Sequence, residues 1–475
     1  MKARSGGRLI PVHPPTVRLR NLLGDGMYMK HTSHFHQLHK RGIDIWAIPA
    51  MYAAAAIATG LILPRIEEYI FPGLTSAASV GQATAIYSAI ASGMIALTGI
   101  VFSLAFVMLQ FSASAYSPRL VPWIARDPVM WHALGIFTAT FLYAIAALSG
   151  VDWHGSGRVP FVSFWLLVLL LLASMAMFIS MIQLMGLLQV NSMLIFTGDQ
   201  GRKVIATTYP PVKSEVAAKG SDDLRALPCT QALIHHGRPR SIQSLDIPTL
   251  VNLAGAHGGI IEMVVAVGDT VVELMPVLRV LGARQLIDEK SLWDGIEMGD
   301  ERTFEQDPKY AIRLLVDIAI RALSPAINDP TTAVQAIDQI EDLLSRLAHC
   351  HLEIGAYRNR DGELRLVVPF PAWEDLLRLA LDEICSCGAT SVQVMRRLNA
   401  LVGDLILHVP EERRPAIRYW QRRLESTVAR SFPDGEERME ASQEDRQGLG
   451  VPRDPASETS SEQATRMNSG GPKEQ

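Results

Sequence analysis

Residues 159–198, VPFVSFWLLVLLLLASMAMFISMIQLMGLLQVNSMLIFTG, contain no Asp, Glu, Lys or Arg. A helix needs about 20 consecutive apolar residues to cross the hydrocarbon core of a bilayer. This run is long enough for one transmembrane helix, which we place at residues 165–189, and for its continuation as a helix beyond the bilayer. The segment therefore predicts an integral membrane protein.

Three further apolar stretches precede this segment in the sequence. We place transmembrane helices at residues 45–63, 84–108 and 133–150, where charged residues are missing. With the run described above, they predict a membrane α-helical bundle of four transmembrane helices within residues 44–200.

Basic residues flanking the spans predict their orientation, because Lys and Arg are retained on the cytoplasmic side. Residues 1–43 carry eight of them, whereas the loop after the first span has Arg65 together with Glu67 and Glu68. We therefore expect residues 1–43 to form a basic cytosolic segment. Four crossings then place the C-terminus in the cytoplasm as well.

The second span carries small residues at three- and four-residue spacing, which places them on one face of a helix. They are Ser88, Ser92, Ala96, Gly99 and Ser103. Small residues let membrane helices approach closely, so this face favours helix packing. The alternative is a pore lined by the hydroxyl groups. Because none of the spans as placed contains a charged residue, we do not expect an ion-coupled pump.

The remainder of the chain predicts a cytosolic α+β region. Residues 201–300 indicate a small β-rich module, which begins with a β-branched run at 203–209 and includes a hairpin that turns at Gly268-Asp269. Residues 301–431 have helical spacing and indicate a helical module. Residues 432–475 have almost no apolar side chains and predict a disordered tail.

A charged stripe lies on the first helix expected in the helical module. Asp307 and Pro308 are typical of a helix start, as N-cap and first helical residue. Arg313, Asp317 and Arg321 follow at four-residue spacing. The stripe fits a solvated face with weak ion pairs, and the alternative is an interface or a polar network.

A tight corner follows that helix. Ser324 and Pro325 end the helix, and Asn328, Asp329 and Pro330 begin the next one. The free backbone N–H groups of a helix start can hold an anion or a partner carboxylate. The corner is therefore either a ligand or partner site or only a well-capped turn.

The sequence lacks the common motifs of catalytic and cofactor sites. It has no phosphate-binding loop, no Gly-x-Ser-x-Gly motif and no His-Glu-x-x-His motif. The clustered His31, His34, His36 and His39 lack the spacing that would bring them to one helix face, so we expect no metal. A formal net charge of −4 argues against a nucleic-acid binder. We therefore expect neither an enzyme nor a cofactor.

The block from Gln306 to Ala333 strongly resembles predicted bacterial membrane proteins catalogued as domain of unknown function 2254. Its most specific part runs from Ser324-Pro325 to Asn328-Asp329-Pro330, and the juxtamembrane Ser117, Pro118 and Arg119 are similar too. The resemblance implies this architecture and a bacterial inner-membrane setting. It implies no activity.

Two main functional hypotheses follow, and an enzyme with its site at the corner of residues 324–330 is a third, less favoured one. The first is a homo-oligomeric channel or transport-like assembly, with lipid and further copies of the chain as partners and a cytosolic domain that assembles or gates it. The order of bundle, β module and helical module resembles small mechanosensitive channels at the level of fold alone. The second is a membrane-anchored sensor or scaffold that acts through the charged stripe and the corner.

Overall fold

The computed structural model describes residues 47–70, 79–115, 128–151, 159–187, 189–211, 224 and 227–450. The chain divides into two compact units. We call residues 1–107 and 123–185 the apolar bundle, and residues 108–122 and 186–475 the C-terminal unit.

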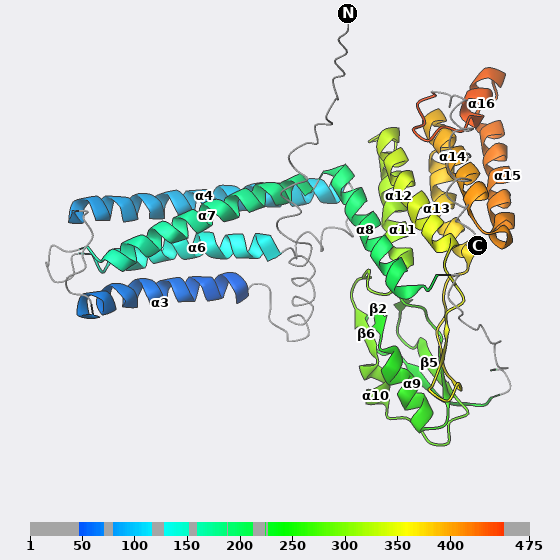
Figure 1. Ribbon diagram of the computed structural model, residues 1–475, viewed down its shortest axis with the longest axis horizontal. Helices are drawn as coiled ribbons and strands as arrows, with labels where there is room; N and C mark the ends of the chain where they lie inside the picture. The colour runs from blue at the N-terminus through cyan, green and yellow to red at the C-terminus, as the bar shows by residue number, and fades with distance from the viewer. Residues whose placement is uncertain are drawn as a thin grey trace, which may run out of the picture. The chain divides into compact units, whose positions relative to one another are not determined.

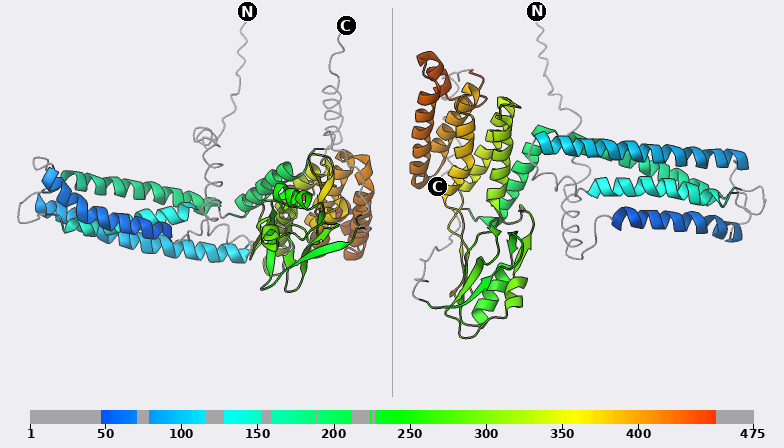
Figure 2. Two further views of the ribbon diagram at one scale, coloured as in Figure 1. Left: turned by 90° about the horizontal axis from the view of Figure 1, so that it is seen from below. Right: turned by 180° about the vertical axis from the view of Figure 1, so that it is seen from behind.

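The apolar bundle contains the helices that were predicted to cross a membrane. Among the described residues, four helices are long and apolar enough to do so. They run side by side in every view (Figures 1 and 2) and are α3 (Ala47–Ile70), α4 (Val80–Ala115), α6 (Pro128–Leu148) and α7 (Phe161–Leu187). The predicted bundle is confirmed, although α3 continues seven residues past the predicted end at residue 63, through Pro64.

Helices α3 and α6 pack closely because glycine stands where they meet. A Cβ atom at Gly60 would lie 2.7 Å from the Cβ of Ala146, and one at Gly135 would lie 2.6 Å from the ring of Tyr52. Close approach of this kind is the usual means by which membrane helices associate. Buried Tyr87, Phe137 and other apolar side chains fill the space between the remaining helices.

The C-terminal unit begins with a helix rather than the expected strand. The run 203–209 lies within α8 (Val190–Thr208) and its C-cap, Tyr209. The β-branched residues there serve helix packing: Val204 and Ile205 are buried, and α8 packs against α11 (Pro308–Ala322) and α12 (Pro330–Ala348). Tertiary contacts have outweighed the β preference of the run.

The β module consists of two sheets among the described residues. One has the order β1-β5-β3-β8-β7 and the other β4-β2-β6. The strands are β1 (Cys229–Ile234), β2 (Arg240–Leu245), β3 (Ile260–Met263), β4 (Thr270–Val271), β5 (Pro276–Leu281), β6 (Ile296–Gly299), β7 (Ala356–Arg358) and β8 (Leu364–Val367). Because β8 pairs in parallel with β3, with Ile261 opposite Leu366, the expected division at residue 300 does not separate the strands.

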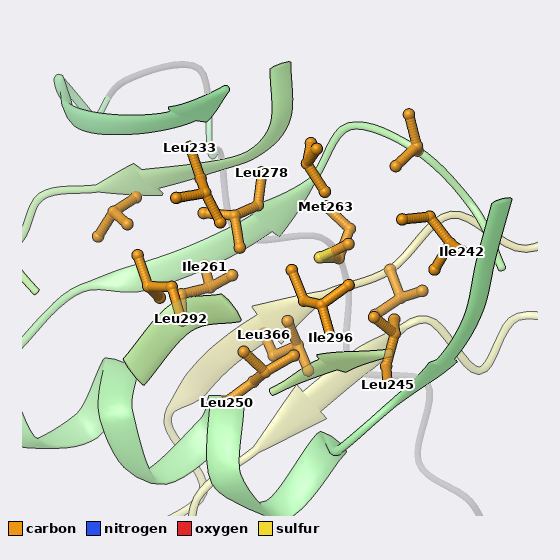
Figure 3. Packing of buried hydrophobic residues seen from close by; sticks show 14 of the residues in the cluster. Leu233, Ile242, Leu245, Leu250, Ile261, Met263, Leu278, Leu292, Ile296 and Leu366 are labelled. Carbon is orange, nitrogen blue, oxygen red and sulfur yellow. The ribbon is translucent and has the colours of Figure 1, made fainter. Parts of the chain in front are cut away.

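The core of the β module lies between these sheets and two short helices, α9 (Ile247–Ala256) and α10 (Glu289–Asp294). Figure 3 shows Leu250 of α9 and Leu292 of α10 directed at the sheet residues Ile261 and Leu366. All four side chains are fully buried. Alternating burial along β3 and β8 matches the two-residue period of a strand.

The expected hairpin at Gly268-Asp269 is not formed. The turn exists, with a φ of 88° at Gly268 and a 2.9 Å hydrogen bond from the Ala266 N–H to Asp269 Oδ2. However, β3 pairs with β5 and β8, whereas β4 pairs with β2 in the other sheet. The turn therefore carries the chain from one sheet to the other.

The helical module is confirmed as a stack of helices (Figures 1 and 2). After α11 and α12 come α13 (Trp373–Cys387), α14 (Val392–His408), the short 3-10 helix η4 (Glu411–Arg413) and α15 (Arg414–Ser431). Helices α11, α12, α13 and α14 each bury an apolar face, as the helical spacing predicted.

The prediction of a disordered tail from residue 432 is wrong for residues 435–450. Helix α16 (Gly435–Ser442) begins at Asp434, whose side chain accepts hydrogen bonds from the N–H groups of Glu436 and Glu437. Farther on, Arg446 forms two hydrogen bonds of 2.8 and 2.7 Å with Asp404 of α14. Polar contacts rather than apolar burial hold this segment, which is why its composition resembles that of a disordered chain.

Candidate functional site

The small residues of the second span lie on the outer face of α4. Ser88, Ser92, Ala96, Gly99 and Ser103 are all exposed within the chain. The face that packs in the bundle is the opposite one and includes Tyr87, Met94 and Val101. The small-residue face therefore does not pack within the described part of this chain, and whether it packs against another helix or lines a pore stays a prediction.

The corner at residues 324–330 is a tightly hydrogen-bonded turn in the C-terminal unit. The Ser324 carbonyl accepts hydrogen bonds from the N–H groups of Ile327 and Asn328, at 3.0 and 2.8 Å, and the Asp329 N–H donates to Ala322 O at 2.8 Å. Asn328 has a φ of 50°, a left-handed conformation that asparagine tolerates better than most residues. The left-handed backbone conformation at this position thus explains the asparagine at residue 328 of the corner.

Asp329 caps the helix that follows the corner, as predicted. Its Oδ1 accepts from the Thr332 N–H at 3.1 Å, and its Oδ2 accepts from the Thr332 hydroxyl at 2.6 Å. Pro330 occupies the first helical position. The carboxylate of the chain itself therefore occupies the place where an outside anion would bind at this helix start. The hydrogen bonds of the corner therefore match the well-capped turn, one of the two alternatives that the sequence left open.

The charged stripe of α11 is divided between two roles. The Arg313 guanidinium pairs with Asp317 on its own helix, at 2.5 Å, and with both carboxylate oxygens of Glu383 on α13. These partners raise the pKa of Arg313 and join α11 to α13. Arg321, half-buried at the end of α11, has no ion pair in the described part of the chain. At one end of the stripe, Arg313 and Asp317 belong to an ion-pair network between two helices. At the other end, Arg321 carries a positive charge without an ion pair in the described part of the chain.

Two groups of predicted residues lie outside the described residues. They are the juxtamembrane Ser117, Pro118 and Arg119, and the cluster His31, His34, His36 and His39.

A buried carboxylate lies at one end of the apolar bundle. The Glu67 side chain, in the last turn of α3, is 3% exposed. Its Oε1 accepts from the Val162 N–H at 2.7 Å, and its Oε2 accepts from the N–H and hydroxyl of Ser163 at 3.0 and 3.2 Å. Glu67 therefore binds the N-terminus of α7, where the helix dipole and free N–H groups favour an anion.

Two tyrosines from the other helices complete this cluster. Tyr143 of α6 donates a 3.0 Å hydrogen bond to the Ser163 carbonyl. Tyr87 of α4 belongs to the same buried cluster as Tyr143, and its hydroxyl has no hydrogen-bond partner among the described residues. We call Glu67, Tyr87, Tyr143 and Ser163 the four-helix polar cluster, since each comes from a different helix of the bundle.

The four-helix polar cluster corrects one sequence inference. The spans were expected to contain no charged residue, because the first was placed at residues 45–63. In the structure α3 continues to Ile70, and its apolar segment extends to Glu67. Glu67 is thus a buried carboxylate at the end of a helix segment that is long and apolar enough to cross a membrane.

A second buried carboxylate lies in the C-terminal unit, where α11 meets the β module. Asp307 was expected to cap α11, but its side chain makes no capping hydrogen bond. Its Oδ2 instead accepts from Arg302 Nε at 3.0 Å and Nη2 at 2.5 Å. Gly268 contacts it so closely that a Cβ there would lie 1.9 Å from Asp307 Oδ2.

Burial determines the electrostatics around Asp307. Removal from water raises the pKa of Asp307, and the positive charges of Arg302 and Lys309 oppose that rise. Burial also raises the pKa of Tyr209, and Asp307 adds to that shift. Asp307 Oδ1 and the Tyr209 hydroxyl are both buried and without hydrogen-bond partners in the described part of the chain.

The described residues offer limited means of holding a metal or a cofactor. Among them, no group of three or more His, Cys, Asp or Glu side chains could hold a metal ion. An open groove of about 600 Å³ lies between α9 and the strands β7 and β8. Arginine and carboxylate side chains mix along it, including Arg358, Arg360 and Glu363. This mixture of charges does not select one class of ligand.

The family of the chain is settled by comparison with known proteins. Residues 44–404 match the model of a family described as "Predicted membrane protein (DUF2254)". The chain belongs to this family. Family membership and the four apolar helices together make it a predicted membrane protein whose function is not established.

Its similar relatives in this family are uncharacterised as well. One protein from Mycobacterium bovis and one from Mycobacterium tuberculosis are each 27% identical over 417 residues, which is 83% of this chain and 78% of the relative. No solved structure matches the chain. The family match covers the bundle, the β module and most of the helical module, and it ends within α14, before α15 and α16.

Sequence reasoning missed both buried carboxylates of this family member, for different reasons. Glu67 follows Pro64 and Arg65, which were taken as the end of the first span, although proline is tolerated inside transmembrane helices. Asp307 precedes Pro308 and resembles an ordinary N-cap. In the structure, Arg302, five residues before Asp307, is its ion-pair partner, but spacing alone did not distinguish the two roles.

Proposed function

We propose that the chain is a homo-oligomeric channel or transport-like protein in which α4 faces other copies of the chain. The observation that carries this proposal is the outward direction of the small-residue face of α4. The proposal includes a bacterial inner-membrane location with both termini in the cytoplasm, as the basic residues of segment 1–43 favour.

The geometry of α4 separates two opposite faces. Val101 packs in the bundle and follows Ser92 by about two and a half turns of 3.6 residues, so the two side chains point in opposite directions. At Gly99, an added Cβ would meet no atom within 4 Å. The small-residue face is thus unoccupied by the described part of this chain.

The composition of that face favours a protein partner over lipid. Lipid tails gain nothing from small side chains, whereas a second helix can approach closely over Ser, Ala and Gly. The exposed side of α4 also carries the large apolar side chains Ile95, Ile100 and Phe102, so the small residues form a stripe within an apolar surface. Copies arranged around α4 would bring Ser88, Ser92 and Ser103 toward a common axis, where hydroxyls could line a water-filled path.

Disulfide trapping in native membranes tests the assembly. Cysteines at Ser92 and Gly99 should cross-link two copies of the chain, while cysteines at Met94 and Val101 should not, because those positions are buried within one copy. The native cysteines, all in the C-terminal unit, are replaced in every variant. Equal cross-linking from both faces, or none from Ser92 and Gly99, would contradict the proposal.

Flux measurements test the transport part separately. Purified protein in liposomes should pass ions or small solutes, and Ser92→Leu should reduce this flux by narrowing the path. Oligomers that cross-link through α4 yet pass no solute under voltage or tension would exclude a channel and leave an assembly role.

The second candidate is a membrane-anchored sensor or scaffold that acts through the corner of the helical module. The observations that favour it are the exposure of Ile327 at that corner and the lack of an ion pair at Arg321 among the described residues. An exposed apolar side chain and an arginine without an ion pair both suit a partner surface. If Ile327→Asp together with Arg321→Ala leaves the cellular cross-linking partners unchanged, this candidate fails.

A further inference from the structure

We propose that the outer edge of the helical module, formed by α15 and α16, binds the same edge of a second copy of the chain running in the opposite direction. In this two-fold pairing, the basic start of α15 in one copy meets the acidic α16 of the other. The contact goes beyond the channel proposal, because it lies in the C-terminal unit and does not depend on contacts between copies through α4.

Helices α15 and α16 lie beside each other at the edge of the helical module away from α8 (Figures 1 and 2). Helix α15 turns one face inward, where Ile417, Trp420 and Leu424 are buried. The helical period of 3.6 residues places Arg418 and Arg422 on the opposite face. Both side chains are exposed, so this face of α15 is uncovered by the described part of the chain.

Positive and negative charge are separated along this edge. Residues 411–423 contain five Arg and two Glu, whereas residues 424–440 contain five acidic residues and two Arg. One end of the edge is therefore positive and the other is negative by the same amount. If two such edges pair in opposite directions, each end meets the opposite charge. A two-fold axis gives this arrangement, because the same surface then serves on both copies.

The charges that would meet across this contact are not used within the chain. Exposed Arg418 and Arg422 form no ion pair among the described residues, and the same holds for Glu436 and Glu437 of α16. By contrast, Arg423 of α15 is already paired with a carboxylate of α13. The four unpaired charges are thus available to a second copy, and a two-fold contact would use each of them twice.

Two large exposed side chains on the same edge favour a protein partner. Tyr419 of α15 is 53% exposed and Met439 of α16 is 68% exposed. Tyr, Met and Arg are enriched in protein interfaces relative to the rest of the surface. Burial of Tyr419 and Met439 between the copies would add apolar contact to ion pairs that individually contribute little at an exposed surface.

The balance of charge selects a second copy over other partners. An anionic lipid surface or a nucleic acid attracts a surplus of basic residues. Residues 411–440 have no such surplus, since they contain as many acidic as basic residues. An unrelated protein would have to match both ends of the edge in the same order, whereas a second copy provides this match by symmetry.

Cross-linking between two cysteine variants of the full chain, co-expressed in native membranes, tests the contact. One copy carries Tyr419→Cys, the other carries Met439→Cys, and the native cysteines are replaced in both. A membrane-permeant bismaleimide should join the two copies, because the pairing brings α15 of one beside α16 of the other. Copies that all carry Tyr419→Cys should cross-link less, since the basic ends of the two edges lie apart.

Charge reversal tests whether the ion pairs hold the copies together. Arg418→Glu with Arg422→Glu in both copies should lower the cross-link yield about tenfold, because attraction becomes repulsion at both ends of the edge. Addition of Glu436→Arg with Glu437→Arg to both copies should restore the yield, since the two ends are then complementary again.

A matched control makes the same change of charge elsewhere. Arg284→Glu with Arg360→Glu, at exposed positions of the β module without ion pairs in the described part of the chain, should leave the yield unchanged. No cross-link between the two cysteine variants, no loss on the first reversal, or no recovery on the second would overturn the proposal. The α4 cross-links at Ser92 and Gly99, measured in the same membranes, persist if only the α15 contact is wrong, so they distinguish this failure from that of the channel proposal.

Discussion

Substitution of Arg302 by methionine should destabilise the C-terminal unit, because it leaves a carboxylate buried without its cation. The Asp307 side chain is 1% exposed and receives two hydrogen bonds from Arg302. Removing one partner of a buried pair costs about 3–5 kcal/mol. Since Arg302 is itself 28% exposed, we expect the lower end, about 3 kcal/mol.

The pH dependence of this loss follows from the direction of the pKa shift. Burial raises the pKa of Asp307 in the folded chain, and Arg302→Met removes the positive charge that opposes the rise. A carboxyl whose folded pKa lies above its unfolded pKa stabilises the fold below the unfolded value. That contribution is lost as the pH rises through the folded value. The variant should therefore be weakest near neutral pH and recover on acidification.

A double-mutant cycle provides the decisive measurement. Asp307→Asn in the Arg302→Met background removes the uncompensated charge, so the double variant should be more stable than Arg302→Met alone, by about 2 kcal/mol. In thermal unfolding, the Tm of Arg302→Met should lie about 6–12 °C below that of wild type, since 1 kcal/mol corresponds to roughly 2–4 °C. Hydrogen exchange in peptides of α11 localises the effect.

Additive effects of the two substitutions, or a loss in Arg302→Met that does not depend on pH, would refute this reasoning. Either result would mean that the pair contributes only packing. The comparison with Arg238→Met serves as a control, because Arg238 pairs with Asp300 where both side chains are largely exposed, and exposed pairs contribute little.

Three further outcomes are expected. Asp329→Ala should destabilise the helical module by about 1 kcal/mol through loss of the α12 cap, measured by denaturant midpoint, and no change would contradict the capping role. Gly268→Ala should cost much more than Gly237→Ala: both have positive φ, but only at Gly268 does the new Cβ meet a neighbour, so equal losses of stability would argue against the contact. Arg446→Ala should loosen residues 443–450 from α14, and limited proteolysis should then cleave that stretch sooner than in wild type.

The features that local sequence determines were the predictable ones. Apolar runs of membrane length predicted all four helices of the bundle, because bilayer thickness sets their length directly. Asp329 and Pro330 predicted the start of α12, since capping involves only neighbouring residues. Each of these rules acts within about one helix length of chain.

The features that depend on distant residues were not predictable in this way. The small-residue face of α4 points outward because Tyr87 and Met94, on the opposite side of the helix, are buried. Periodicity alone separates the two sides of the helix but does not say which of them is buried. The partner of Glu67 lies 95 residues away at Val162. The helical conformation of 203–209 likewise depends on α11 and α12, which lie more than 90 residues later in the sequence.

The parallel pairing of β3 with β8 has a consequence for synthesis of the chain. Ile261 and its partner Leu366 are separated by the whole of α11 and α12, so β3 leaves the ribosome long before its neighbour exists. At roughly 5–20 residues per second, the wait lasts on the order of 5–20 s. During that time one edge of β3 lacks its partner strand, while the earlier apolar helices are already available for insertion. The nascent β module therefore keeps this edge of β3 unpaired until β8 has been made, and a chain interrupted near residue 300 would retain that open edge.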